Sequence, residues 1–191
     1  MRRLALVAIS LAAVVLAACG DATPSTTGVA ATVNGASVSI QAYNAAVQSL
    51  RERLEQRTGH ALNAAVPADA QRLQGIEAAG VRAVVATAVI EQIATAHHVT
   101  VSDADVSATL QRLQSTAGNA DALVADLGAS GLSDAGTRAA VRELLVQQRL
   151  RAADPTGYDT AFASALRDAK VTVYAPPCTT QHAYPACLQG L

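Results

Sequence analysis

Apolar residues recur at helical spacing along most of the chain, and the longest such stretch runs from Pro67 and Asp69 to about His98. Its apolar positions form one wide face, which predicts a long helix at the centre of the core. Gly80 lies within this stretch, and a glycine there weakens a helix by about 1 kcal/mol relative to alanine. We therefore interpret Gly80 as a mark of close contact with another helix. The face is formed by Leu73, Ile76, Val81, Val84, Val85, Val89 and Ile93.

Five further helices are predicted from the same spacing and from residues that cap helix ends. The clearest start is Ser102 with Asp105 three residues later, a capping-box-like pair in which aspartate takes the place of glutamate. Ser39, Ser133 and the Asp154-Pro155 pair are the expected starts of three others. The predicted helices cover about residues 40–58, 103–117, 120–127, 134–151 and 155–169, and the expected inner face of the fourth is Val141, Leu144, Leu145 and Gln148.

Short β-prone segments stand at the two ends of this helical region. Val29–Val33 is followed at once by Asn34-Gly35, a pair that tolerates the positive φ angles of a type I′ turn, and this predicts a small hairpin. Val171–Tyr174 reads as a strand that ends before two consecutive prolines. The expected fold class is therefore mainly α, with an N-terminal β-hairpin and one late strand.

The first 28 residues predict export and lipid attachment. Two arginines precede an apolar run, Leu4–Leu16, which is too short to span a bilayer, and Leu16-Ala17-Ala18-Cys19 matches the lipobox of bacterial lipoproteins. Residues 1–18 are expected to be a signal peptide, Cys19 the lipidated first residue of the mature chain, and 19–28 a flexible tether. The protein would then sit on the extracytoplasmic face of a cell membrane. The alternatives are an ordinary secretory signal with a chance cysteine, or an uncleaved anchor.

Charge and composition limit the partners. Removing residues 1–18 leaves 173 residues (191 − 18), with 12 basic and 15 acidic side chains and a net charge of −3 (12 − 15). A weakly acidic chain with one lysine, Lys170, argues against a nucleic-acid binder. Alanine dominates and tryptophan is absent, which suits helices packed through small side chains.

Cys178 and Cys187 are the candidate site residues near the C-terminus. Outside the cytoplasm thiols tend to oxidise, and with Cys19 acylated an even pair remains, so a disulfide is the favoured reading. A metal site of Cys178, His182 and Cys187 is the alternative, but three irregularly spaced ligands without a fourth match zinc poorly. We expect no metal, no cofactor and no catalytic residue, because no recognisable phosphate loop, paired-carboxylate site or nucleophile motif is present.

Several motifs, in order, resemble the N-terminal domain of the SurA family of periplasmic chaperones and the related PrsA-like foldases. Residues 31–39 are similar to the family's "VNG-x-x-I-(T/S)" opening, and residues 99–106 to its "V-(T/S)-(D/E)-x-(E/D)-V" helix start. Residues 142–150 look like its late helix, and 169–173 like its closing strand. The resemblance implies one helical domain over 29–174, in which the closing strand joins the N-terminal hairpin, followed by a C-terminal tail, 175–191.

The resemblance also implies a function, that of a client-binding chaperone domain for unfolded or exported polypeptides. In such proteins a parvulin-type prolyl isomerase domain often stands before the closing helix and strand. Here Arg151 runs within a few residues into Pro155, so we expect no isomerase activity. Two alternatives remain: an accessory envelope lipoprotein that binds one folded partner, and an isomerase-related foldase. The scarcity of methionine and aromatic residues means that any client surface would be lined by Val, Leu, Ile and Ala.

Overall fold

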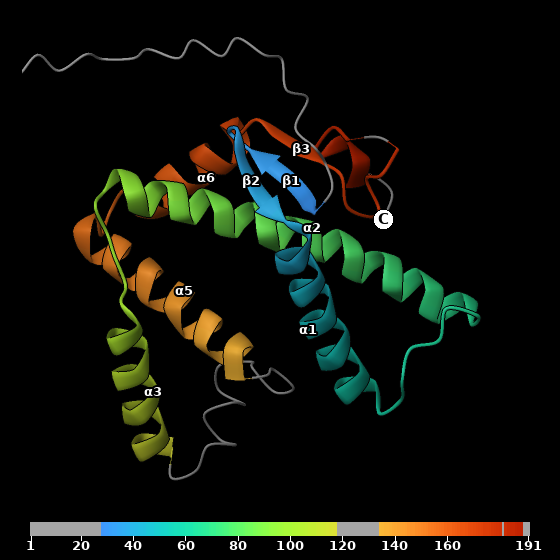
Figure 1. Cartoon of the computed structure of the whole chain (residues 1–191), viewed down its shortest axis with the longest axis horizontal. Coiled ribbons are helices and arrows are strands. Elements are labelled where there is room, and N and C mark those ends of the chain that lie inside the picture. The colour runs from blue at the N-terminus through green and yellow to red at the C-terminus, as the bar shows by residue number, and fades with distance from the viewer. Residues whose placement is uncertain (1–27, 118–133, 181, 189–191) are drawn as a thin grey trace, which may run out of the picture.

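The computed structural model describes residues 28–117, 134–180 and 182–188, so Cys19, Ser133 and the predicted 120–127 helix lie outside the described residues. Helices dominate, and a small sheet lies against the long helix α2 (Figure 1). The elements in chain order are β1 (Val29–Val33), β2 (Ala36–Ser39), α1 (Ile40–Thr58), α2 (Pro67–Ala96), α3 (Asp103–Ala117), α5 (Asp134–Ala153), α6 (Tyr158–Asp168), β3 (Val171–Val173) and the 3₁₀ turn η1 (Ala186–Leu188).

The sheet joins the two ends of the domain. Its strand order is β2-β1-β3, with both pairs antiparallel, so the late strand completes the N-terminal hairpin as the sequence predicts. Asn34 and Gly35 form the turn with φ angles of 52° and 84°. The same turn is tied to the chain before β3, because Asn34 N donates to the Lys170 carbonyl (2.8 Å) and Lys170 N to Asn34 Oδ1 (2.9 Å).

Helix α2 is the core helix, as its pattern predicts. It contacts α1, α5, α6 and two strands of the sheet, and Val81, Val85 and Val89 are each at most 1% exposed. By length and composition alone the helix is apolar enough to cross a membrane. Its packing explains that composition, because its apolar side chains meet apolar side chains of neighbouring elements on several sides.

Helix α1 packs on α2 at Gly80. The helix begins where Ser39 Oγ accepts from Ala42 N (3.1 Å), and it ends at Gly59, whose N–H donates to the Glu55 carbonyl with φ at 73°. A Cβ atom at Gly80 would lie 2.6 Å from Val47 Cγ2 and 3.4 Å from Tyr43 Cε2. Gly80 thus lets the two helices approach to a distance that a side chain would prevent.

We predict that Gly80→Ala lowers the free energy of unfolding by about 1 kcal/mol. Overpacking costs about 1–3 kcal/mol, which exceeds the gain of about 1 kcal/mol in helix propensity. Gly75 in the same helix is the matched control, because a Cβ there meets nothing within 4 Å, and Gly75→Ala should be stabilising. Urea denaturation followed by circular dichroism measures both. Adding Val47→Ala should relieve the clash, and equal effects of the two glycine substitutions would contradict the assigned contact.

Helices α3 and α5 pair with each other and extend from α2 on the side opposite the sheet (Figure 1). The capping box at the start of α3 is present: Ser102 N donates to Asp105 Oδ2 (2.8 Å), and Asp105 N donates to Ser102 Oγ (3.1 Å). Val106 on α3 and Val141 on α5 are fully buried. We call α3 and α5 the charged arm, for the ion pairs described below.

Two predictions about the later helices are wrong in detail. The last helix begins at Tyr158 rather than Pro155, because Asp154 Oδ1 accepts from Gly157 N (2.8 Å) and holds residues 154–157 in a turn. On α5, Leu144 and Gln148 are exposed, whereas Leu150 is buried. The apolar face shifts because the end of α5 packs on a small cluster that includes Ile90, Ala94 and Tyr158.

Candidate functional site

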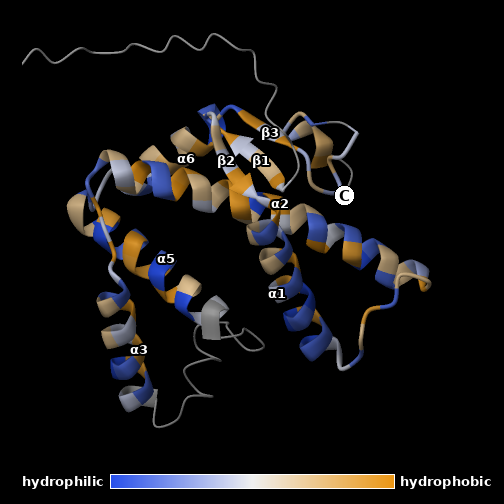
Figure 2. Cartoon of the chain, viewed as in Figure 1, coloured by the Kyte–Doolittle hydropathy of each residue, from blue (hydrophilic) through white to orange (hydrophobic). Residues whose placement is uncertain are grey.

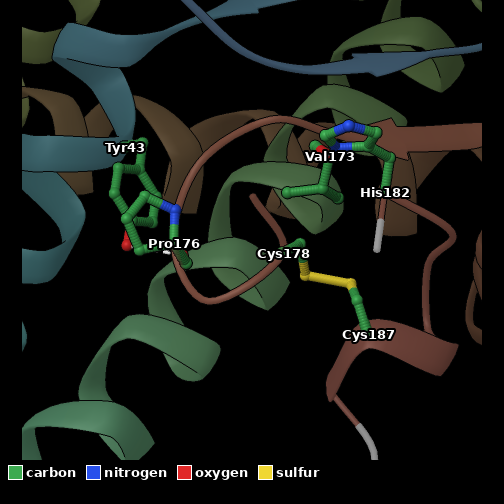
Figure 3. The surroundings of a disulfide bond; sticks show 6 residues. All are labelled: Tyr43, Val173, Pro176, Cys178, His182 and Cys187. Carbon is green, nitrogen blue, oxygen red and sulfur yellow. Dashed lines mark hydrogen bonds between the residues drawn. A yellow bond between two sulfur atoms is a disulfide. The ribbon is translucent and has the colours of Figure 1, made fainter. Parts of the chain in front are cut away.

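The predicted cysteine pair lies at the C-terminal end of the described chain. The sulfur atoms of Cys178 and Cys187 are joined at 2.00 Å, with the Cα atoms 5.2 Å apart (Figure 3). Cys178 is fully buried in the main core cluster. Among the residues that the structure describes, no group of three or more His, Cys, Asp or Glu side chains could hold a metal ion.

Residues 175–180 and 182–188, which we call the C-terminal strap, pack into the same core as the sheet. Ala175 and Leu188 are buried beside Val173 and Ala30. The Tyr43 hydroxyl donates to the Pro176 carbonyl at 2.7 Å, which links the strap to α1. The sequence suggested a tail for this segment, whereas the structure makes it part of the domain.

The strap also makes backbone contacts with the outer edge of β3. Val173 N donates to the His182 carbonyl (2.9 Å), and Thr172 and Ala183 form an isolated antiparallel bridge. The His182 ring also binds Val173: its Nδ1 lies 2.8 Å from the Val173 carbonyl oxygen. Because a carbonyl oxygen can only accept, Nδ1 is the donor. Figure 3 shows His182 beside Val173, with the disulfide below them. The exposed edge of β3 is thereby covered.

Two ion pairs join the two helices of the charged arm, α3 and α5. Arg149 binds Asp105 at 3.0 Å, and Arg142 binds Asp103 and also donates to the Val101 carbonyl (2.7 Å). The backbone N–H of Ser102, then its hydroxyl and Arg149, lower the pKa of Asp105 to about 2. These contacts tie the start of α3, and the segment just before it, to α5, so their role is structural.

A second polar cluster orders the connection between α1 and α2. Asp69 is 4% exposed and accepts from Asn63 N (3.2 Å) and Arg72 (2.8 Å), with His60 Nε2 at 3.5 Å. The hydrogen bond from Asn63 N is the main reason that the pKa of Asp69 is lowered. His60, in the loop after α1, therefore has Asp69 as a partner. Asp69 thus links the loop to the first turn of α2.

The described surface offers little exposed apolar area. Val66 and Leu144 are the large hydrophobic residues that are exposed on the described surface, at 44% and 37%. Leu144 lies in a depression of about 270 Å³ on α5, lined by Ala140, Glu143, Leu144 and Gln147. Another, of about 380 Å³, lies at the polar end of α1. The Leu144 depression is the better site for an apolar side chain of a partner, and the sequence had assigned Leu144 to the core.

A mainly helical domain whose late strand joins an N-terminal hairpin is the fold that the motif resemblance implies. The family model described as a SurA-like N-terminal domain matches residues 2–151 of this chain, and the chain belongs to that family. This confirms the resemblance seen in the motifs and places the protein among chaperone and protein-folding families. Neither the curated proteins nor the solved structures that were compared gave a match.

The family match and the structural domain have different ends. The match stops at Arg151, within α5, whereas α6, β3 and the strap follow it in the chain. These later elements are nonetheless built into the fold, because β3 pairs with β1 and the strap packs on the same core. The part of the chain beyond the match therefore completes the sheet that the N-terminal hairpin begins.

Proposed function

We propose that this protein is a membrane-anchored extracytoplasmic lipoprotein whose SurA-like domain binds unfolded or exported polypeptides without catalysing a reaction. The observation that carries the proposal is the family match over residues 2–151. The Leu16–Cys19 lipobox supports the anchor. The Cys178–Cys187 pair is typical of an oxidising compartment, which supports export.

The anchor is tested by acyl labelling of the expressed full-length protein. Labelled palmitate should enter the wild-type protein, and Cys19→Ser should abolish the label, because the thiol is the acceptor. Cys187→Ser is the matched control and should keep the label. Labelling that persists in Cys19→Ser would overturn the assignment of Cys19.

Client binding is tested with residues 20–191, which contain every described element. Stoichiometric amounts should suppress the aggregation of an unfolded exported protein, measured by light scattering. Leu144→Asp should weaken this effect, since it places a charge in the Leu144 depression, whereas Val66→Asp, at the other exposed hydrophobe, should not. Unchanged aggregation at stoichiometric excess would remove the proposal.

A single folded partner is the second candidate function, and the small exposed apolar area favours it. Promiscuous binding surfaces are rich in flexible methionine or broad apolar area, and the described surface here has two large exposed hydrophobes. Crosslinking in cells separates the candidates: many exported clients indicate a chaperone, and one dominant product indicates an accessory protein.

The non-catalytic part of the proposal rests on the junction between α5 and α6. Residues 154–157 connect them in this chain, so no isomerase domain is inserted at this point. A prolyl-isomerisation assay with residues 20–191 tests this, and activity comparable with a parvulin would overturn it.

A further inference from the structure

The strap lies beside the place where the tether meets the fold. The Ala30 carbonyl accepts from Tyr174 N (2.7 Å) and from Ala175 N (3.1 Å), so the first turn of the strap is bonded to β1 one residue after the strand begins. Figure 1 shows the strap and the start of β1 at the same end of the sheet. The charged arm leaves α2 on the opposite side.

The strap is uncharged. Asp, Glu, Lys and Arg make up 15% of the chain, so about three would be expected among the 21 residues from Val171 to Leu191, yet none is present. The exposed residues of the strap are Pro176, Thr179, Thr180, His182, Ala183 and Pro185. Tyr184 in the strap and Tyr174 just before it, two of the four tyrosines, are partly exposed. Figure 2 shows many hydrophilic positions on α1 and the charged arm, and others along α2 and at the hairpin turn.

The tether is short compared with the domain. Residues 20–28 separate Cys19 from β1, and nine residues span about 30 Å when fully extended. As a flexible chain they average about 17 Å end to end. The 30 residues of α2 alone are about 45 Å long. An anchored domain therefore cannot turn every face to the membrane, and the face that holds the start of β1 is the one nearest the anchor.

We propose that the strap is a membrane-contact surface that rests on the interface of a phospholipid bilayer and directs the charged arm and the Leu144 depression away from it. The inference rests on the proposed lipidation of Cys19. Bringing charged side chains against a bilayer would require stripping their water, whereas threonine, proline and alanine carry little such cost. Tyrosine favours the interface because its ring is apolar and its hydroxyl remains hydrated.

The experiment uses tryptophan as a position-specific probe, because the chain has none of its own. Thr179→Trp and, separately, Thr180→Trp place the probe on the strap, and Gln56→Trp places it at the far end of α1, where the residue is exposed. The lipidated full-length protein is reconstituted into phosphatidylcholine vesicles with and without brominated lipid. Both strap probes should lose intensity in brominated vesicles and shift to shorter wavelength, while Gln56→Trp keeps its intensity.

Mass spectrometry of the same samples separates the two proposals. If the acyl chains are attached and the strap probes are quenched no more than Gln56→Trp, the membrane-contact surface is wrong while the anchor stands. If the acyl chains are missing, the anchor itself is wrong and the contact surface falls with it. Circular dichroism of each variant checks that it is folded. Two strap positions are used so that a substitution that disturbs the structure at one of them does not decide the result.

Discussion

Ending the chain after Tyr174 is expected to unfold most of the domain, although the sequence assigned the deleted residues to a tail. The deletion removes three residues of the main core, Ala175, Cys178 and Leu188, which are at most 5% exposed. Burying a leucine contributes about 1.5–3 kcal/mol, and the disulfide about 2–3 kcal/mol. Domains are stable by only about 5–15 kcal/mol in total. These two contributions together come to about 3.5–6 kcal/mol, which is as large as the whole stability of a domain near the lower end of that range.

Urea denaturation of residues 20–191 and 20–174, followed by circular dichroism, measures this effect. Residues 20–188 are the matched control, because that deletion removes none of the described strap and should leave the midpoint unchanged. A truncated chain that unfolds at the wild-type midpoint would show that the strap is dispensable and that the core ends at β3.

The disulfide can be separated from the packing by an intermediate variant. Replacing Cys178 and Cys187 together by alanine should cost about 2–3 kcal/mol, because the bond closes a short loop in the unfolded chain. The double variant should remain folded, unlike the truncation. Reducing the disulfide of the wild-type protein should lower the free energy of unfolding as much as the double substitution does. If the double variant loses as much stability as the truncated chain, the whole effect of the truncation belongs to the disulfide.

Local signals in the sequence predicted the elements that depend on neighbouring residues. The Asn34-Gly35 turn, the Ser39 cap and the Ser102 capping box each need only a few adjacent residues, and each is formed as expected. The pairing of β3 with β1 followed from the family resemblance, which covers elements far apart in the chain.

The features that the sequence missed depend on distant contacts. The strap lacks a helical or strand period, so nothing in its pattern shows that Cys178 and Leu188 fill the core. Leu144 has the helical spacing of a buried residue, but which face of α5 is buried depends on what the helix packs against. Leu150 is buried instead, because it packs against Ile90 and Tyr158. The α6 start was misplaced because Asp154 caps a turn as readily as a helix.

The Tyr43 side chain joins α1, α2 and the strap, and Tyr43→Ala is expected to lower the free energy of unfolding by about 3–5 kcal/mol, the range for deleting a large buried aromatic group. Tyr43 is 3% exposed, its ring packs beside Gly80, and its hydroxyl donates to the Pro176 carbonyl. Tyr43→Phe is the matched control. It keeps the ring and loses one hydrogen bond, so it should cost only about 1 kcal/mol.

Alkaline pH tests the same side chain from another direction. Burial, reinforced by the negative charge of Glu77, raises the pKa of Tyr43 from 10.0 to about 12. The folded state then holds its phenolic proton more tightly than the unfolded state, so this stabilisation is complete below pH 10 and is lost as the pH rises toward 12. Tyr43→Phe lacks the group, and its urea midpoint should fall less across this range than that of the wild type. Burial also raises the pKa of Tyr158, but that residue is present in both proteins and cancels in the comparison. Parallel pH profiles for the two proteins would mean that Tyr43 ionises as freely in the folded chain as in water, which is incompatible with a ring buried against Gly80 and the strap.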